Sequence, residues 1–355
     1  MRRILTALTG SAVVLGCLAA PAAASTTGSL GSTGSLGSLG LGSSEPVSEF
    51  DLQAHRGGLG LHTESSPAAF AHALELGVTT LELDTQITKD EEVVITHDRR
   101  LNPGVCQDTE PAFDGDPDFP YMGKYIKDLT LEQVRTLDCG SIQRSGYPGQ
   151  QTHPGEPMML LSELFDLVKA HGADGPGGVV LNIETKVEAG APEETAPREL
   201  FVRRVHEEIQ DSGLAKQVTI QSFDWGALKA YHELDPAMPL VALTNHDFLQ
   251  VGQPGASPWL GGIDVDDFGG DGVAAAASID GVTTYSPVTT RPQSCEVGTD
   301  GCTPYVTQEM VDTAREHGLG VVPWTINDLP TMTYLLDIGV DGMITDYPDR
   351  LRDLM

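Results

Sequence analysis

The sequence predicts an α/β fold, a (β/α)8 TIM barrel with an insertion after the second strand. The chain has 355 residues, and short β-branched runs alternate with helical patterns along most of it. Several of these patterns end at a glycine, the residue that often follows the last turn of a helix. Strands separated by helices form parallel sheets, and eight such units close into a barrel.

Eight runs account for the strands, and helical patterns lie between most of them. We expect the strands at 50–55, 79–86, 179–184, 217–222, 239–244, 282–286, 320–326 and 342–345. We expect the helices at 66–76, 160–171, 197–212, 225–233, 308–317 and 331–338. The connection from the fifth to the sixth strand, 245–281, is ambiguous.

The N-terminal residues are predicted to lie outside the barrel. Arg2 and Arg3 precede a short apolar run and an A-x-A cleavage site at 22–24, so residues 1–24 read as a secretory signal peptide. A lipoprotein anchor at Cys17 is the rival interpretation, but its neighbours fit that motif poorly. Residues 25–45 form a Gly/Ser-rich flexible tether, and 46–355 form the barrel domain. We therefore expect a secreted protein, in the extracellular space or the cell envelope.

Disulfides are expected because an even number of cysteines remains after the signal peptide is removed. These are Cys106, Cys139, Cys295 and Cys302. Four cysteines allow three pairings, and sequence proximity favours Cys106 with Cys139 and Cys295 with Cys302. The alternative, a zinc site, lacks the support of a Cys-x-x-Cys spacing.

The insertion occupies residues 102–151. It is rich in Pro, Gly and Asp, contains Cys106 and Cys139, and has one helical stretch near 131–137. Insertions of this length in compact folds often serve as lids or recognition modules. A disulfide within it would stiffen such a module.

The formal net charge is −30, and a field of this sign disfavours nucleic acids and anionic membrane surfaces as partners. Beyond the signal peptide no apolar run approaches the ~20 residues of a spanning helix, so no stable membrane insertion is expected. The expected partner is a small molecule. The sequence leaves the oligomeric state open.

The candidate site consists of polar residues at the carboxyl ends of the predicted strands, where barrels of this class build their active sites. It comprises His55, Arg56, Glu82, Asp84, His97, Glu184, Lys186 and Trp324. Glu82 and Asp84 are two residues apart in one strand, so both face the barrel interior. Each residue alone would more often be structural, and the prediction rests on their convergence.

These residue types suit phosphodiester cleavage. Three inward carboxylates repel one another and require a cation, and their oxygen ligands favour Ca²⁺ or Mg²⁺ over zinc. Arg56 and Lys186 supply positive charge for a phosphate, and two histidines supply a base and an acid near neutral pH. The chemistry therefore predicts a metal-dependent phosphodiesterase.

The same residues lie in motifs that resemble those of the glycerophosphodiester phosphodiesterases. The motifs are AHRGG at 54–58, LELD at 81–84, VITHD at 94–98, NIETK at 182–186, QSF at 221–223 and WTIN at 324–327. The resemblance covers roughly 54–351, in family order. The chain departs from it at 64–66, where Glu-Ser-Ser replaces the usual Glu-Asn-Thr, and in the large insertion.

The resemblance implies a (β/α)8 barrel that hydrolyses glycerophosphodiesters to glycerol 3-phosphate and an alcohol. It implies that Glu82, Asp84 and Glu184 bind one divalent cation. It assigns acid–base catalysis to His55 and His97, phosphate binding to Arg56 and Lys186, and the wall of the glycerol pocket to Trp324. Calcium is favoured over magnesium because an exported enzyme meets more calcium.

Two alternatives stay open. One is a phospholipase C- or D-like phosphodiesterase acting on intact phospholipid, although the acidic, Gly/Pro-rich insertion argues against docking on lipid. The other is an inactive barrel that serves as a binding protein, which would predict the loss of a metal carboxylate or a histidine. The alcohol released and the roles of the two histidines as acid or base also stay open.

Overall fold

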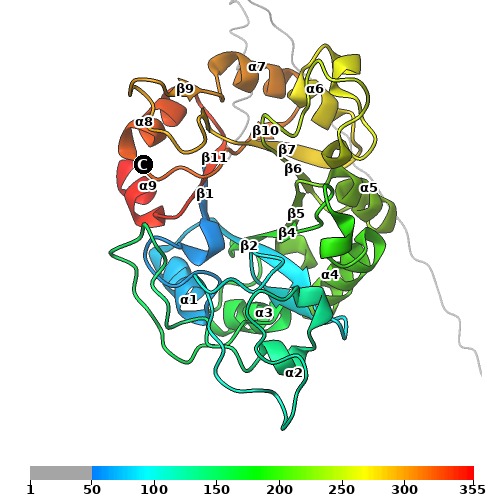
Figure 1. Ribbon diagram of the computed structural model, residues 1–355. Helices are drawn as coiled ribbons and strands as arrows, with labels where there is room; N and C mark the ends of the chain where they lie inside the picture. The colour runs from blue at the N-terminus through cyan, green and yellow to red at the C-terminus, as the bar shows by residue number, and fades with distance from the viewer. Residues whose placement is uncertain (1–49) are drawn as a thin grey trace, which may run out of the picture. The chain divides into compact units, whose positions relative to one another are not determined.

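The computed structural model describes residues 50–355. Eight parallel strands form a nearly closed ring, and helices surround it on the outside (Figure 1). The order around the ring is β10, β7, β6, β5, β4, β2, β1 and β11. The strands are β1 Asp51–Ala54, β2 Thr80–Ile87, β4 Val180–Thr185, β5 Val218–Ser222, β6 Leu240–Thr244, β7 Val282–Pro287, β10 Gly320–Val321 and β11 Gly342–Thr345. The predicted (β/α)8 barrel is confirmed.

The ring comes closest to opening between β10 and β11. β10 covers only the first two residues of the predicted strand 320–326, and Pro323 in its continuation has no amide N–H to donate. The Asp341 amide still donates to the Val321 carbonyl at 2.9 Å, and the Ile344 amide donates to the Pro323 carbonyl at 3.0 Å. On the other side β11 pairs in parallel with β1, so the first and last strands of the barrel are neighbours.

β2 shows how the sequence pattern directs side chains to the two faces of the barrel wall. All eight of its residues are buried. Leu81 and Leu83 belong to the main hydrophobic core. Glu82 and Asp84 alternate with them and line a cavity at the barrel mouth. The period of two therefore delivers two carboxylates to the interior from a strand whose other face is apolar.

The six predicted helices are all present. They are α1 Pro67–Leu76, α3 Leu161–Ala170, α4 Arg198–Ser212, α5 Trp225–Leu234, α7 Gln308–Glu316 and α8 Leu329–Asp337. α1 has a typical cap at each end. At its start the Ser66 hydroxyl accepts a hydrogen bond from the Ala69 amide, and at its end Gly77 is left-handed with φ 75°.

Two helices are additions to the prediction, α6 Gly272–Ala277 and α9 Pro348–Leu354. α6 lies in the ambiguous connection 245–281, which also holds the 3₁₀ turns η5 Pro258–Leu260 and η6 Val265–Phe268. Asp271 caps α6 by accepting from the Val273 amide at 2.8 Å. Both helices span two turns or fewer, too short for a helical period to stand out in the sequence. Three further 3₁₀ turns of the barrel are η1 His55–Gly57, η3 Pro192–Glu194 and η4 Ala215–Gln217.

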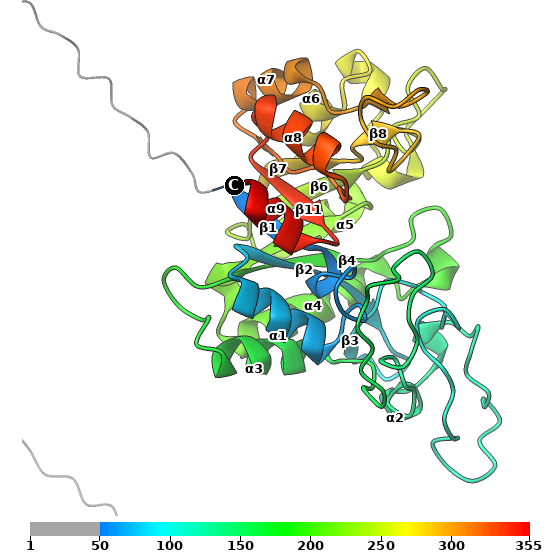
Figure 2. The same cartoon turned by 90° about the vertical axis from the view of Figure 1, so that its left-hand side faces the viewer.

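The insertion packs around a small core of its own. It follows β3 Val93–Ile95, which is antiparallel to β2, and includes η2 Ile126–Asp128 and α2 Leu131–Val134. This core consists of Val94, Leu101, Cys106, Tyr121, Ile126, Leu129, Val134, Leu137 and Met158. Figure 2 shows the insertion on the side of the molecule that also carries β8.

Both disulfides join the cysteines that sequence proximity favours. Cys106 and Cys139 close the insertion, with the sulfur atoms 2.08 Å apart. Cys295 and Cys302 close a second loop between β8 Thr290–Arg291 and β9 Thr303–Pro304.

The predicted signal peptide, 1–24, and the tether, 25–45, lie outside the described residues. Within 50–355, no helix combines the length and the apolar character needed to cross a membrane.

Candidate active site

All eight residues of the predicted site lie around one cavity of about 290 Å³ at the carboxyl ends of the strands. The cavity is lined by His55, Arg56, Glu82, Asp84, His97, Glu184, Lys186 and Trp324, together with other residues. They come from β2 and β4 and from the segments that follow β1, β3, β4 and β10. The convergence predicted from the sequence is therefore present in the structure.

Three of these residues form a compact acidic cluster. Glu82, Asp84 and Glu184 each offer a carboxylate oxygen within 4.8 Å of the other two, and all three side chains are buried. Burial raises the pKa of Glu184 well above its ordinary value, and burial together with Asp84 raises the pKa of Glu82. Burial also acts to raise the pKa of Asp84, but Lys186, His97 and Arg56 outweigh it and lower that pKa.

The cluster fits a hard divalent cation. Its donors are all carboxylate oxygens, the ligands that Ca²⁺ and Mg²⁺ prefer. The buried Asp84 Oδ2 atom makes an ion-pair contact with Arg56 Nε at 3.1 Å that lacks the geometry of a hydrogen bond. Glu82 is held on both oxygens: Gln221 donates to Oε1 at 2.6 Å and the Arg56 amide donates to Oε2 at 2.9 Å. The cluster is thus oriented by its neighbours.

Two cations border the acidic cluster. Lys186 Nζ lies 3.5 Å from Asp84 Oδ1 and 3.3 Å from Glu184 Oε1. Arg56 Nε lies 3.1 Å from Asp84 Oδ2, and Arg56 Nη1 lies 3.0 Å from Glu64 Oε1. The Arg56 and Lys186 side chains therefore give the cavity two positive charges in a protein whose formal net charge is −30.

The turn after β1 requires glycine next to Arg56. Arg56 is left-handed with φ 52°, and Gly57 has φ 82°. A Cβ on Gly57 would lie 3.0 Å from the Ala69 Cβ and from Phe70 atoms on α1. The close approach of this turn to α1 sets the place from which Arg56 enters the cavity.

We expect Gly57→Ala to lower the free energy of unfolding by about 2–4 kcal/mol, because a left-handed alanine and a crowded Cβ add their costs. The measurement is urea denaturation. Gly115→Ala is the matched control, since Gly115 has φ 78° and nothing lies within 4 Å of its Cβ position. Equal losses in the two variants would show that the contact with α1 does not matter.

Each of the two histidines is held at Nδ1 by an aspartate. His55 Nδ1 lies 2.5 Å from Asp346 Oδ1, and His97 Nδ1 lies 2.8 Å from Asp98 Oδ1. When Nδ1–H donates to the carboxylate, Nε2 is left as the reactive atom. Both rings line the cavity, so the arrangement presents two oriented imidazoles to one space.

The charges around the two histidines differ. Burial and Arg56 act to lower the pKa of His55, but the Asp346 and Glu82 carboxylates outweigh them, and the pKa is raised. Desolvation, Arg56 and Lys186 lower the pKa of His97 to about 3. The structure therefore places one histidine that favours the protonated form and one that favours the neutral form beside the same cavity.

Sequence reasoning missed the residues that orient the site. Asp346 follows β11, and Asn327 donates to its Oδ2 atom at 2.7 Å. Asp98 accepts a second hydrogen bond from Asn102 at 2.7 Å. A usable signal existed, because Asp98 directly follows His97 in a quoted motif and Asp346 directly follows the last predicted strand.

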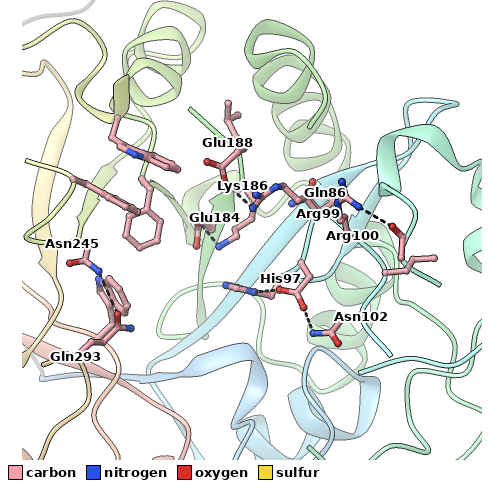
Figure 3. Close-up of a pocket in the computed structure, with 18 of the residues that line it drawn as sticks. Gln86, His97, Arg99, Arg100, Asn102, Glu184, Lys186, Glu188, Asn245 and Gln293 are labelled. Atoms are coloured by element: carbon pink, nitrogen blue, oxygen red, sulfur yellow. Dashed lines mark hydrogen bonds and ion pairs between the residues drawn. The ribbon is translucent and has the colours of Figure 1, made fainter. Parts of the chain in front are cut away.

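A larger cavity of about 690 Å³ opens from the same centre (Figure 3). It shares His97, Glu184 and Lys186 with the smaller cavity. Its aromatic lining consists of Phe223, Phe248, Trp259 and Trp324. The Phe248 and Trp259 rings stack with centroids 4.2 Å apart, and Phe223 meets Trp324 edge to face at 5.3 Å. Phe223 also meets Phe248 edge to face at 5.6 Å, so the four rings form one continuous aromatic surface along this cavity.

The sequence was compared with models of known protein families, and one of them matches most of the chain. The family model described as "Glycerophosphoryl diester phosphodiesterase family" matches residues 55–350. The chain belongs to this family. It is therefore a phosphodiesterase, and the resemblance drawn from the motifs is confirmed.

Relatives of known name agree with this family. A glycerophosphodiester phosphodiesterase of Bacillus subtilis is 28% identical over 300 residues, which cover 83% of each chain. One from Caldanaerobacter subterraneus is 24% identical, over 85% of this chain and 96% of its own. These phosphodiesterases match the barrel along nearly its whole length.

Solved structures share the fold. A putative glycerophosphoryl diester phosphodiesterase from Silicibacter pomeroyi superposes with a TM-score of 0.68 and 25% identity, covering 85% of this chain and 91% of its own. An Oleispira antarctica phosphodiesterase, solved in complex with the product sn-glycerol-3-phosphate, has a TM-score of 0.57 and 19% identity. It covers 85% of this chain and 94% of its own, and it supports the barrel fold.

Proposed function

We propose that the protein hydrolyses glycerophosphodiesters to glycerol 3-phosphate and an alcohol, using one divalent cation and the His55/His97 pair. The observation that carries the proposal is the pair of aspartate-held imidazoles beside a cavity that also contains the acidic cluster and two cations. The Oleispira antarctica protein, with its bound sn-glycerol-3-phosphate, supports the same product.

In this proposal Glu82, Asp84 and Glu184 hold the cation. The cation supplies charge that stabilises the phosphate oxygens as negative charge develops on them. Calcium is favoured over magnesium, because an exported enzyme meets it at higher concentration. The three buried carboxylates, each with an oxygen within 4.8 Å of the other two, support a site for a ligand of this kind.

The remaining residues bind and orient the substrate. Arg56 and Lys186 bind the phosphate, the first as a planar fork and the second as a point charge. Trp324 walls the glycerol pocket, and its indole N–H donates to the Ser286 carbonyl at 3.1 Å, which fixes the ring. These contacts hold the phosphorus between the two histidines.

The histidines carry the proton transfers. One Nε2 atom takes a proton from the nucleophile, which is water or the glycerol 2-hydroxyl, as the new P–O bond forms. The other histidine, as an imidazolium, gives a proton to the oxygen of the departing alcohol as the old P–O bond breaks. Where the glycerol 2-hydroxyl attacks, the product of this step is a cyclic glycerophosphate; water then attacks its phosphorus, the P–O bond to the 2-oxygen breaks, and glycerol 3-phosphate is released. Asp98 and Asp346 keep both Nδ1 atoms protonated, so both Nε2 atoms face the reaction.

The test is an activity panel with the metal-loaded enzyme. Glycerophosphodiesters with different alcohols are compared with lysophospholipids and intact phospholipids, and glycerol 3-phosphate is measured directly. We expect turnover of the deacylated substrates and release of glycerol 3-phosphate. Turnover confined to intact phospholipid would replace this function with a phospholipase, and binding without turnover would indicate an inactive barrel.

We also propose that the larger cavity receives the alcohol. Its aromatic surface supports this, because ring faces bind the apolar or cationic part of an organic alcohol. We expect Trp259→Ala to raise KM about tenfold for a phosphodiester with a bulky alcohol and less than twofold for one with ethanol. Equal changes for both substrates would place the alcohol elsewhere.

Export of the protein is part of the proposal. The disulfides Cys106–Cys139 and Cys295–Cys302 support it, since disulfides persist in oxidising compartments. Fractionation of the producing cell, with mass determination of the mature N-terminus, tests it. Cleavage near Ala24 is the expected result, and a lipid on Cys17 would instead indicate an anchored lipoprotein.

A further inference from the structure

Residues 139–153, which run from the last part of the insertion (102–151) to just past its end, reach the cavity at the barrel mouth, where Arg144 and Tyr147 line it. This segment begins at the Cys106–Cys139 disulfide. It is then fastened to the loop after β1: the Gln151 amide donates to the Leu61 carbonyl at 2.8 Å, and the Thr63 amide donates to the Gln151 carbonyl at 3.0 Å. We call this segment the return segment. Its backbone is therefore held at both ends.

The first such side chain is Tyr147. Its hydroxyl donates to Asp346 Oδ2 at 2.7 Å, while Asp346 Oδ1 holds His55 Nδ1. Burial and the Asp346 carboxylate raise the pKa of Tyr147, so its hydroxyl keeps its proton and stays a donor. The Tyr147 ring lies against the Tyr347 ring, with centroids 6.2 Å apart.

The second is Arg144. Its Nη1 atom lies 2.5 Å from Glu64 Oε2, while Glu64 Oε1 pairs with Arg56 Nη1 at 3.0 Å. Glu64 is buried, and Arg144 lines the same cavity as Arg56. Two carboxylates, Asp346 and Glu64, therefore each connect one side chain of the return segment to one residue of the candidate site.

We propose that Tyr147 and Arg144 are positioning residues of the phosphodiesterase, and that the insertion completes the active site rather than covering it. Tyr147 acts on His55 through Asp346, and Arg144 acts on Arg56 through Glu64. The barrel alone supplies every residue of the acidic cluster, and the insertion adds a contact to each connecting carboxylate. Tyr147 joins Asn327 of the barrel at Asp346 Oδ2, and Arg144 pairs with Glu64 Oε2. This inference rests on the proposed function.

We call the connection from Tyr147 through Asp346 to His55 the first arm, and the connection from Arg144 through Glu64 to Arg56 the second arm. Loss of each arm is expected to change a different kinetic constant. Asp346 orients a proton-transfer group, so loss of the Tyr147 hydroxyl lowers kcat. Glu64 orients a phosphate-binding group, so loss of the Arg144 charge raises KM. A hydrogen bond to a charged group that is buried commonly changes a rate or an affinity by about tenfold. A purely structural role would instead lower stability and leave both constants of the folded enzyme unchanged.

Tyr147→Phe tests the first arm. We expect kcat on a glycerophosphodiester to fall about tenfold, KM to change less than twofold, and the pH profile of kcat to shift, because His55 loses part of its orientation. Tyr334→Phe is the matched control. Tyr334 lies on the outer helix α8, and its hydroxyl donates to the Val306 carbonyl at 3.0 Å. Assays are run where circular dichroism shows both variants folded. A kcat within twofold of wild type overturns the proposal for this arm.

Arg144→Met tests the second arm. We expect KM to rise about tenfold with kcat changed less than threefold, and Arg144→Lys to restore part of the loss. Arg135→Met is the control, because Arg135 also lies in the insertion and pairs with Glu163 at 2.7 Å, away from the cavity. Equal effects of Arg144→Met and Arg135→Met would mean that the insertion acts only through its stability.

Failure of this inference can be told from failure of the proposed function. A wild-type enzyme that hydrolyses no glycerophosphodiester contradicts the function itself. A wild-type enzyme that hydrolyses them, with Tyr147→Phe and Arg144→Met unchanged, contradicts only the role of the return segment.

Discussion

We expect His97→Ala to reduce kcat on a glycerophosphodiester about a thousandfold, with a small change in KM. The variant removes an imidazole that Asp98 holds by Nδ1 and that lines both cavities. A positioned acid or base contributes roughly 10²- to 10⁴-fold to a rate, and the change removes the whole group. Steady-state kinetics with the metal-loaded enzyme measures it.

The control for this variant is His171→Ala. His171 is exposed at the end of α3, where its Nδ1 atom contacts the Leu167 carbonyl at 2.9 Å. It lies away from both cavities, so its loss is expected to leave the kinetics unchanged. Near-wild-type turnover of His97→Ala would remove this histidine from the reaction.

We expect chelation to reduce activity at least a hundredfold, and added Ca²⁺ to restore more of it than added Mg²⁺. Without a cation, three buried carboxylates stand within 4.8 Å of one another, and the phosphate loses its main source of positive charge. The chelated enzyme is assayed after each metal is added back separately. Retention of activity after complete chelation would take the metal out of the mechanism.

Glu184→Gln tests the same site through the protein. It keeps the shape of the side chain and removes one ligand charge, so we expect Ca²⁺ affinity, measured by calorimetry, to fall at least tenfold together with activity. Glu309→Gln on α7 is the control, because Glu309 is an exposed residue outside both cavities. Unchanged Ca²⁺ binding by Glu184→Gln would show that this carboxylate is not a ligand.

The parts of the site carried by regular strands were predictable from the sequence. Glu82 and Asp84 alternate with buried leucines in β2, and that alternation alone directs them inward. Glu184 ends the next barrel strand along the chain, which pairs with β2 in parallel, with Asp84 opposite Glu184. Because parallel strands end at one rim, the position of each residue in its strand fixed where it meets the others.

The parts that were not predictable depend on long loops. Tyr147 lies in an insertion without a hydrophobic period, so nothing in its local sequence directs it to Asp346, 199 positions away. α6 was missed for a related reason, since six residues of Gly, Val and Ala show no polar face. The shortening of β10 follows from Pro323, which a pattern of apolar residues does not register.

The pairing of β1 with β11 makes activity a property of the finished chain. His55 and Asp346 are 291 positions apart and meet only when the last strand has docked beside the first. A chain still emerging from the ribosome therefore holds an unoriented His55 and is expected to be inactive. In refolding experiments, recovery of catalysis would report this final docking step, whereas circular dichroism would already register the helices that form earlier.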